Sequence, residues 1–187
     1  MKIVATYDTN SEAANAVASS IDKCKVYSSA EELYEQVDAV YIATPHLSHY
    51  GYIKAAINAG KHVLVETPMV LNGEHAKELF AFAEEKGVIL MEANKTAHCP
   101  AFNHLMVMIK SGVIGDVVDI EASESKLWTD DMSLREFDPK QAGGSFYELG
   151  SYTLLPIIKL MGCRYENLNI YSRMKDGVDM CTRGVLR

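Results

Sequence analysis

Short apolar runs alternate with longer amphipathic stretches through the first 95 residues, and this alternation restricts the chain to few folds. The apolar runs at residues 38–43 and 62–65 have the near-continuous hydrophobicity of strands that are covered on both faces. The stretches at residues 48–59 and 72–86 carry apolar residues at helical spacing, and a glycine follows each of them. Strand–helix repeats with such short connections predict a parallel sheet with right-handed crossovers, so the expected fold class is α/β.

The pattern changes after about Asn94. We expect the following elements there: helices over residues 100–110 and 145–161, one long alternating strand over 115–128, and paired strands over 167–174 and 178–186. The segment Lys175-Asp176-Gly177 between the last two strands is a hairpin signal. Two domains are therefore predicted, a parallel α/β domain over residues 1–95 and an α+β domain with an antiparallel sheet over residues 96–187.

Composition and charge exclude several classes of protein. Eighteen basic against twenty-five acidic residues give a formal net charge of -7, which argues against a nucleic-acid partner, since phosphate neutralisation needs clustered Lys and Arg. The longest apolar runs are much shorter than the roughly 18–20 residues of a membrane span. The four cysteines lie far apart without a C-x-x-C pair, so neither a metal site nor a disulfide framework is expected. A cytoplasmic protein is the resulting expectation.

Several motifs stand in a fixed order along the chain: V-D-A-V-Y-I-A-T-P at residues 37–45, His49, A-G-K-H-V-L-V-E-T-P at 59–68, S-G-V-I-G-D-V at 111–117 and G-G-S-F-Y-E-L-G-S-Y at 143–152. In order and spacing they resemble the motifs of the Gfo/Idh/MocA family, the glucose–fructose oxidoreductases and inositol dehydrogenases. The resemblance implies a Rossmann-type NAD(P)-binding domain followed by an oxidoreductase α/β domain.

The resemblance also implies that both domains are incomplete. Family members begin with a strand and a G-x-G-x-x-G-type turn that binds the cofactor pyrophosphate, and nothing in this chain corresponds to them. The family's C-terminal sheet is also longer than the segment after Asn167. We therefore expect an internal piece of a longer protein, or a truncated gene product.

The resemblance implies cofactor contacts at the ends of three strands. An acidic residue at the position of Asp8 accepts hydrogen bonds from the adenosine ribose hydroxyls, and no basic residue lies between Asp8 and Lys23 to receive a 2′-phosphate. NAD is thus expected rather than NADP. The alternative is that Asp8 only caps the following helix.

The Thr44-Pro45-His46 segment and His49 follow the next apolar strand, where family members contact the cofactor near the nicotinamide ribose. Alternatively, His46 caps the following helix and His49 is a half-exposed surface residue.

The segment Glu66-Thr67-Pro68 replaces the family's E-K-P, whose lysine contacts the nicotinamide side and assists proton transfer. A hydroxyl cannot carry that positive charge, so Thr67 loses the standard role while Glu66 and Pro68 keep the turn.

Three residues are candidates for catalysis. Lys95 follows the last strand of the parallel sheet and is the possible substitute for the missing lysine, the alternative being a solvated surface lysine. Glu148 and Tyr152 stand where the family has the aspartate and histidine of D-x-G-x-H, four residues apart on one face of the predicted helix. Alternatively, Tyr152 packs in the core and Glu148 lies on the surface. Gly143-Gly144 indicates a backbone that approaches a ligand closely.

The function expected from the resemblance is NAD-dependent hydride transfer at a secondary alcohol of a sugar or cyclitol, with a homo-oligomer formed through the C-terminal sheet. The alternative is a non-catalytic relative that acts as a ligand-binding or interaction protein, because the usual catalytic lysine and histidine are missing. Convergence of Lys95 and Tyr152 on one cavity would favour the enzyme.

Overall fold

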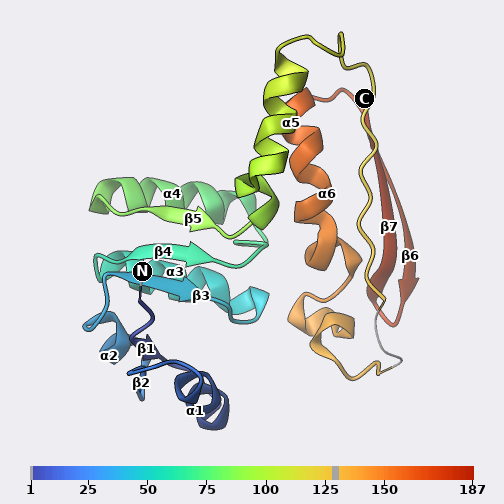
Figure 1. Cartoon of the computed structure of the whole chain (residues 1–187). Helices are drawn as coiled ribbons and strands as arrows, with labels where there is room; N and C mark the ends of the chain where they lie inside the picture. Colours follow the sequence, from blue (N-terminus) through green and yellow to red (C-terminus); the bar gives the residue numbers. More distant parts are fainter. Residues whose placement is uncertain (1, 128–130) are drawn as a thin grey trace. The chain divides into compact units, whose positions relative to one another are not determined.

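The computed structural model describes residues 2–127 and 131–187, which form two compact units, Met1–Glu92 and Ala93–Arg187. The first unit contains β1 (Ala5–Thr6), α1 (Ser11–Ser19), β2 (Lys25–Val26), α2 (Ala30–Tyr34), β3 (Ala39–Ile42), the 3₁₀ turn η1 (His46–Ser48), α3 (His49–Asn58), β4 (His62–Val65), α4 (Gly73–Lys86) and β5 (Leu90–Glu92) (Figure 1). The second contains η2 (Lys95–His98), α5 (Pro100–Lys110), η3 (Arg135–Phe137), η4 (Pro139–Gln141), α6 (Ser145–Met161), β6 (Leu168–Lys175) and β7 (Val178–Leu186). Each unit is described by itself.

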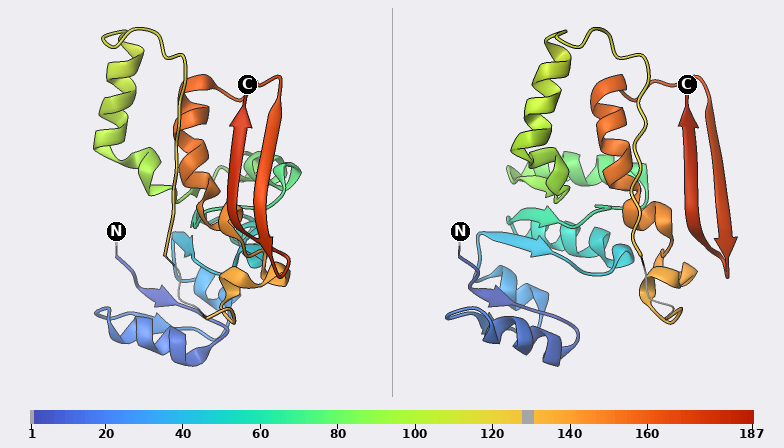
Figure 2. Two further views of the ribbon diagram at one scale, coloured as in Figure 1. Left: turned by 90° about the vertical axis from the view of Figure 1, so that its right-hand side faces the viewer. Right: turned by 45° about the vertical axis from the view of Figure 1, so that its right-hand side comes forward.

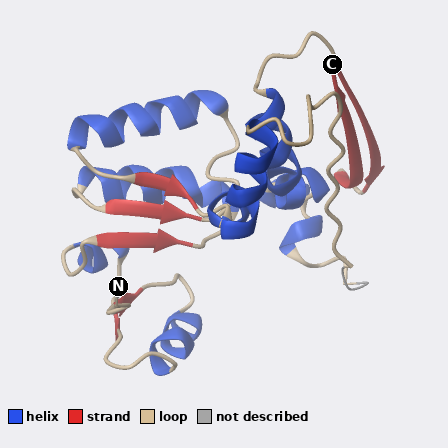
Figure 3. Cartoon of the chain, turned by 45° about the horizontal axis from the view of Figure 1, so that its top comes forward, coloured by secondary structure: helices blue, strands red, loops and turns tan. Residues whose placement is uncertain are grey.

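All strand pairs within the first unit are parallel, as the α/β pattern predicts. The strands β3, β4 and β5 pair in that order, with Ala39 opposite His62 and Val63 opposite Leu90, and they lie side by side in Figure 3. The strands β1 and β2 form a separate two-stranded sheet. Because parallel strands require crossover connections, each of α1, α3 and α4 links two strands that pair with each other. The predicted fold class is confirmed for this half of the chain.

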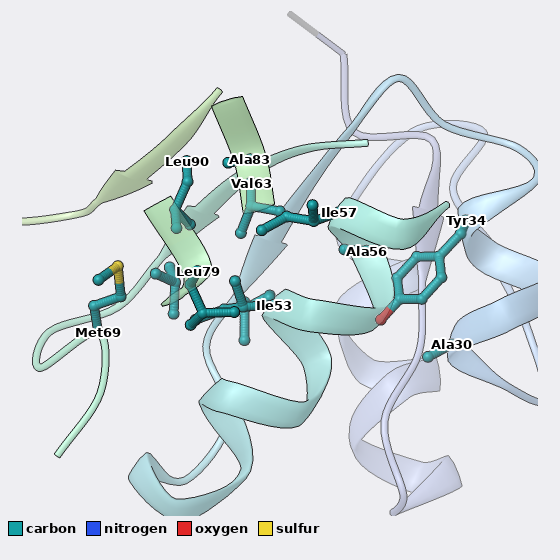
Figure 4. Close-up of a cluster of buried hydrophobic side chains, with 12 residues drawn as sticks. Ala30, Tyr34, Ile53, Ala56, Ile57, Val63, Met69, Leu79, Ala83 and Leu90 are labelled. Carbon is teal, nitrogen blue, oxygen red and sulfur yellow. The ribbon is translucent and has the colours of Figure 1, made fainter. Parts of the chain in front are cut away.

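The core of the first unit is built from the apolar faces of these helices and the strands beneath them. Ile53 and Ile57 of α3, Leu79 of α4 and Val65 of β4 are fully buried, and Figure 4 shows Ile53, Ile57 and Leu79 in one cluster with Val63. Burying one such side chain contributes about 1.5–3 kcal/mol. Tyr34 of α2 closes one side of the cluster, and burial raises the pKa of its phenol to about 12.

Polar residues at the helix ends set the limits of these elements. The Asn72 side chain accepts a hydrogen bond from the Glu74 amide at the start of α4, at 2.8 Å. Gly87 ends the same helix in the left-handed conformation, at φ 66°, which a glycine adopts without a steric penalty. Ser29 caps α2 in the same manner through the Glu32 amide. These boundaries follow directly from the local sequence.

The second unit is α+β. Strands β6 and β7 form an antiparallel hairpin in which Lys175 stands opposite Val178, and α6 lies against β7. The helix predicted over residues 100–110 and the hairpin are confirmed. In the described residues, none of the helices is both long and apolar enough to cross a membrane.

The long strand predicted over residues 115–128 is wrong for its described part. Residues 116–127 carry no strand assignment, and Figure 2 shows them as an extended coil. Val118 and Leu127 are 88% and 99% exposed, whereas Val117, Ile120 and Ala122 of the alternating pattern are half-buried, yet the segment forms no strand. A strand is stabilised by ladder hydrogen bonds and cross-strand contacts, and alternation in the sequence cannot supply them. Residue 128 lies outside the described residues.

Candidate functional site

The carboxyl ends of β3 and β4 lie at one edge of the parallel sheet, where α/β sheets bind ligands. Thr44 and Pro45 follow β3, and the turn at residues 66–69 follows β4. The predicted cofactor residues of these two loops are therefore brought to the same edge.

The turn at residues 66–69 is anchored by side chains from both neighbouring strands. The Tyr41 hydroxyl of β3 donates a short hydrogen bond to the Glu66 carboxylate. From the other side, the Glu92 carboxylate of β5 accepts the Met69 amide at 2.8 Å. Thr67 lies between these anchors. Its hydroxyl oxygen is buried and, within the described part of the chain, has no hydrogen-bond partner.

The two histidines near this turn are both buried. His49 is 0% exposed, and its ring nitrogens lie 2.7 Å from the Thr44 carbonyl oxygen and 3.0 Å from that of Pro68. His46 packs edge-on against it, with ring centroids 5.9 Å apart. The surface alternative for His49 is therefore wrong. The residue at the N-cap of α3 is Ser48, and His46 begins η1.

Asp8 is exposed and follows β1. Its Oδ1 accepts a hydrogen bond from the Asn10 backbone amide at 2.7 Å. The cap of α1 is Asn10, whose side-chain oxygen accepts the Glu12 amide at 2.9 Å. Asp8 therefore organises the turn before the helix and does not cap the helix directly.

In the second unit, Lys95 and Tyr152 lie close together. The Lys95 Nζ is 5.8 Å from the centroid of the Tyr152 ring, a cation–π geometry. Asn94, which is buried, donates from Nδ2 to the Ser151 carbonyl oxygen at 3.1 Å and so ties the segment before η2 to α6. Lys95 is exposed and Tyr152 is half-buried. The two side chains therefore approach each other, whereas their convergence on one cavity stays a prediction.

Glu148 lies one turn before Tyr152 on α6 and is held by Arg135, which no sequence motif singles out. Arg135 Nη1 is 2.9 Å from Glu148 Oε1, and Nη2 donates to Oε2 at 3.2 Å. One hydrogen bond and one close ion-pair contact therefore hold the carboxylate against the guanidinium. The Glu148 side chain is 13% exposed, so the surface alternative is wrong. No spacing rule could have identified Arg135, because it lies in an irregular polar stretch.

The glycine pair before α6 is required by the chain itself. A Cβ on Gly143 would lie 2.5 Å from the Glu136 carbonyl oxygen, and Gly144 has φ 120° with the Asp179 carboxylate against it. Asp179 of β7 accepts the Phe146 amide at 2.8 Å and thereby caps α6 from outside the helix. The close approach that the sequence indicates is made to the polypeptide in the structure, at the Glu136 carbonyl oxygen and the Asp179 carboxylate.

The chemistry available is that of proton donors and acceptors. The second unit offers a cation, a phenol and a carboxylate along η2 and α6, and the first unit offers two anchored loops at one sheet edge. Among the described residues, no group of three or more His, Cys, Asp or Glu side chains could hold a metal ion.

Comparison with known proteins gives consistent results. Residues 1–94 match the family model GFO_IDH_MocA, described as an oxidoreductase family with an NAD-binding Rossmann fold. The scyllo-inositol 2-dehydrogenase (NADP(+)) IolU of Bacillus subtilis is 30% identical over 187 residues, which cover 95% of this chain and 56% of that protein. The trans-1,2-dihydrobenzene-1,2-diol dehydrogenase of Bos taurus is 34% identical over 163 residues, covering 86% and 48%.

Solved structures agree with the fold. KijD10, a 3-ketoreductase from Actinomadura kijaniata in complex with NADP and TDP-benzene, superposes with a TM-score of 0.77 at 27% identity, covering 91% of this chain and 51% of that one. The chain spans about half the length of the curated relatives it matches.

Replacing Gly143 tests why α6 begins where it does. Gly143→Ala should lower the free energy of unfolding by about 1–3 kcal/mol, because the new methyl group meets a backbone carbonyl that cannot move aside alone. Gly184→Ala, where no atom lies within 4 Å, is the matched control in β7. Urea unfolding of both variants measures the difference, and equal stability would contradict the explanation.

Proposed function

Because the chain belongs to the Gfo/Idh/MocA family of oxidoreductases, we propose that the protein transfers a hydride between a nicotinamide cofactor and a secondary alcohol or ketone on a sugar or cyclitol ring. One relative is named as an inositol dehydrogenase and another as a ketoreductase, so both names describe alcohol–ketone chemistry. In this proposal residues 1–95 contribute to the cofactor domain and residues 96–187 to the substrate domain.

The residues of the first unit fit a dinucleotide. When bound, the nicotinamide group supplies or accepts the hydride. Asp8 would accept the ribose hydroxyls of the adenosine, and the loops at residues 44–46 and 66–68 would border the nicotinamide end. The buried Thr67 hydroxyl, which lacks a hydrogen-bond partner in the described structure, supports this fit, because an unpaired buried oxygen is costly unless a ligand completes it.

The observation that carries the proposal is the approach of Lys95 Nζ to the Tyr152 ring. A phenol donates its proton to a ketone oxygen most readily when a nearby cation stabilises the phenolate that forms. Tyr152 is thus the proposed acid–base group, and Lys95 stabilises its charged form. Glu148, oriented by Arg135, would accept a hydrogen bond from a substrate hydroxyl and position the ring. In this proposal, Lys95 and Tyr152 perform the proton transfer that the family's lysine assists and that the uncharged Thr67 cannot.

Replacing the proton-carrying pair should abolish most of the activity. Losing a positioned acid–base group costs about 10²–10⁴-fold in rate, so Lys95→Ala and Tyr152→Phe should each lower turnover by about that factor. Affinity for the cofactor should stay nearly unchanged. Single-turnover rates on a panel of polyols and inositols measure turnover, and fluorescence titration with the reduced cofactor measures its affinity.

The matched controls are another phenol of α6 and another lysine of the second unit. Tyr147→Phe removes a phenol from the first turns of α6, and Lys110→Ala removes a cation from the end of α5. Full rates in both catalytic variants would overturn the assignment and favour a non-catalytic, ligand-binding protein. Loss of rate in the controls as well would mean that the variants act through stability.

We propose NAD as the cofactor of this protein, with Asp8 as the selecting residue, although IolU and KijD10 are named with NADP. A 2′-phosphate beside the Asp8 carboxylate would be repelled, so Asp8→Ser should shift the ratio of NADPH to NADH affinity by about tenfold toward NADPH. Asp22→Ser, which removes an exposed carboxylate beyond α1, is the control. Fluorescence titration with both reduced cofactors gives the ratio, and an unchanged ratio in Asp8→Ser refutes this role.

We propose that the protein acts in the cytoplasm, without a nucleic-acid or membrane partner. We also propose that copies of the protein associate through the β6–β7 hairpin. Ile170, Tyr171 and Met174 of β6 are exposed apolar side chains on a sheet edge, and such edges favour association. Light scattering at micromolar concentration should therefore give at least a dimer. Ile170→Lys should lower the measured mass, since a charge on the edge opposes pairing, and Val118→Lys is the control outside the sheet. A wild-type monomer excludes this interface.

A further inference from the structure

We infer that His49 is a positioning residue that fixes the spacing between the loops following β3 and β4, and that it acts on a bound cofactor only through them. The inference deepens the proposed function, because it concerns the same sheet edge. It differs from the expectation of a direct contact between the His49 ring and the cofactor.

The geometry of the ring carries the inference. His49 begins α3 and is 0% exposed. Its Nε2 lies 2.7 Å from the carbonyl oxygen of Thr44, in the first loop, and its Nδ1 lies 3.0 Å from that of Pro68, in the second. One rigid ring therefore spans both loops, and neither nitrogen faces solvent.

The chemistry of the two contacts explains why the residue is a histidine. A carbonyl oxygen only accepts hydrogen bonds, so a ring with one N–H donates to one of the two carbonyls, while its other nitrogen lies against the second. The two nitrogens stand at opposite edges of one flat ring, so a single side chain reaches both loops. Glutamine carries both donor hydrogens on a single nitrogen, so its amide cannot span the two carbonyl oxygens in the same way.

The bridge matters because both loops carry hydroxyls at the same edge. The Thr44 hydroxyl already accepts a hydrogen bond from Ser48 at 2.7 Å, whereas the buried Thr67 hydroxyl has no hydrogen-bond partner among the described residues. Pro68 follows Thr67 directly, so the bond from His49 to the Pro68 carbonyl limits where the Thr67 hydroxyl can stand. A displacement of about 1 Å at such a site can cost about 100-fold in activity.

Amide hydrogen exchange on the full chain tests the bridge without any cofactor. The Ser48 amide donates to Pro45 at 2.9 Å and the Met69 amide to Glu92 at 2.8 Å, so both report loop order. His49→Leu, of similar volume without donors, should speed exchange at both amides by about tenfold relative to the amides of β4. His49→Gln, with one donor nitrogen, should give a smaller increase.

The matched control is Ile53→Val, one turn later on α3 and equally buried. It should speed exchange across the whole core of the unit and leave no excess at the two loops. If His49→Leu gives the same uniform pattern as Ile53→Val, the positioning role is wrong. If His49→Leu does not fold, His49→Gln decides, and exchange equal to wild type in that variant overturns the inference.

Titration with NADH and NADPH separates this inference from the proposed function. Wild-type chain that binds neither cofactor contradicts the proposed function, while the exchange result still decides the role of His49. Where binding is seen, His49→Leu should weaken it by about tenfold or more, and Ile53→Val should leave it unchanged at temperatures where both variants are folded. Unchanged cofactor affinity in His49→Leu would overturn the inference.

Discussion

The parallel pairing of β3, β4 and β5 is the constraint on which the first unit depends. Parallel strands need a crossover for each new strand, and a helix such as α3 must then pack on the sheet. Ile53 and Ile57 meet this requirement with fully buried side chains. In a parallel sheet the carboxyl ends of all strands lie at one edge. The loops with the candidate cofactor residues therefore lie at the same edge because of strand direction alone.

That edge is organised by side chains that reach from neighbouring elements. Tyr41 and Glu92 hold the ends of the turn at residues 66–69, and His49 spans to the loop after β3. Side chains from β3, β5 and α3 thus hold the backbone of this turn in place. Thr67 stands in this restricted turn without a charge, which is the chemical reason to look for the proton-carrying group elsewhere.

The candidate acid–base residues of the second unit depend on how α6 begins. The start of α6 is fixed by Gly143 and by the carboxylate of Asp179, so every later residue of the helix has a defined direction. Glu148 and Tyr152 consequently share a face, and each is met by a cation, from Arg135 and Lys95 respectively. The carboxylate and the phenol lie one helix turn apart, and a positive charge stands beside each of them. This arrangement suits acid–base chemistry.

The sequence by itself determined the elements whose signals are local: apolar runs and caps such as Asn72 and Gly87 predict the α/β half, and the motifs predict the family. Only the tertiary structure decided which side chains contact each other and which strands pair. It showed both ring nitrogens of His49 on carbonyls, Arg135 on Glu148, and no regular strand over residues 116–127. The physical reason is that hydrogen bonds and strand ladders join residues distant in the chain, and periodicity carries no information about a distant partner.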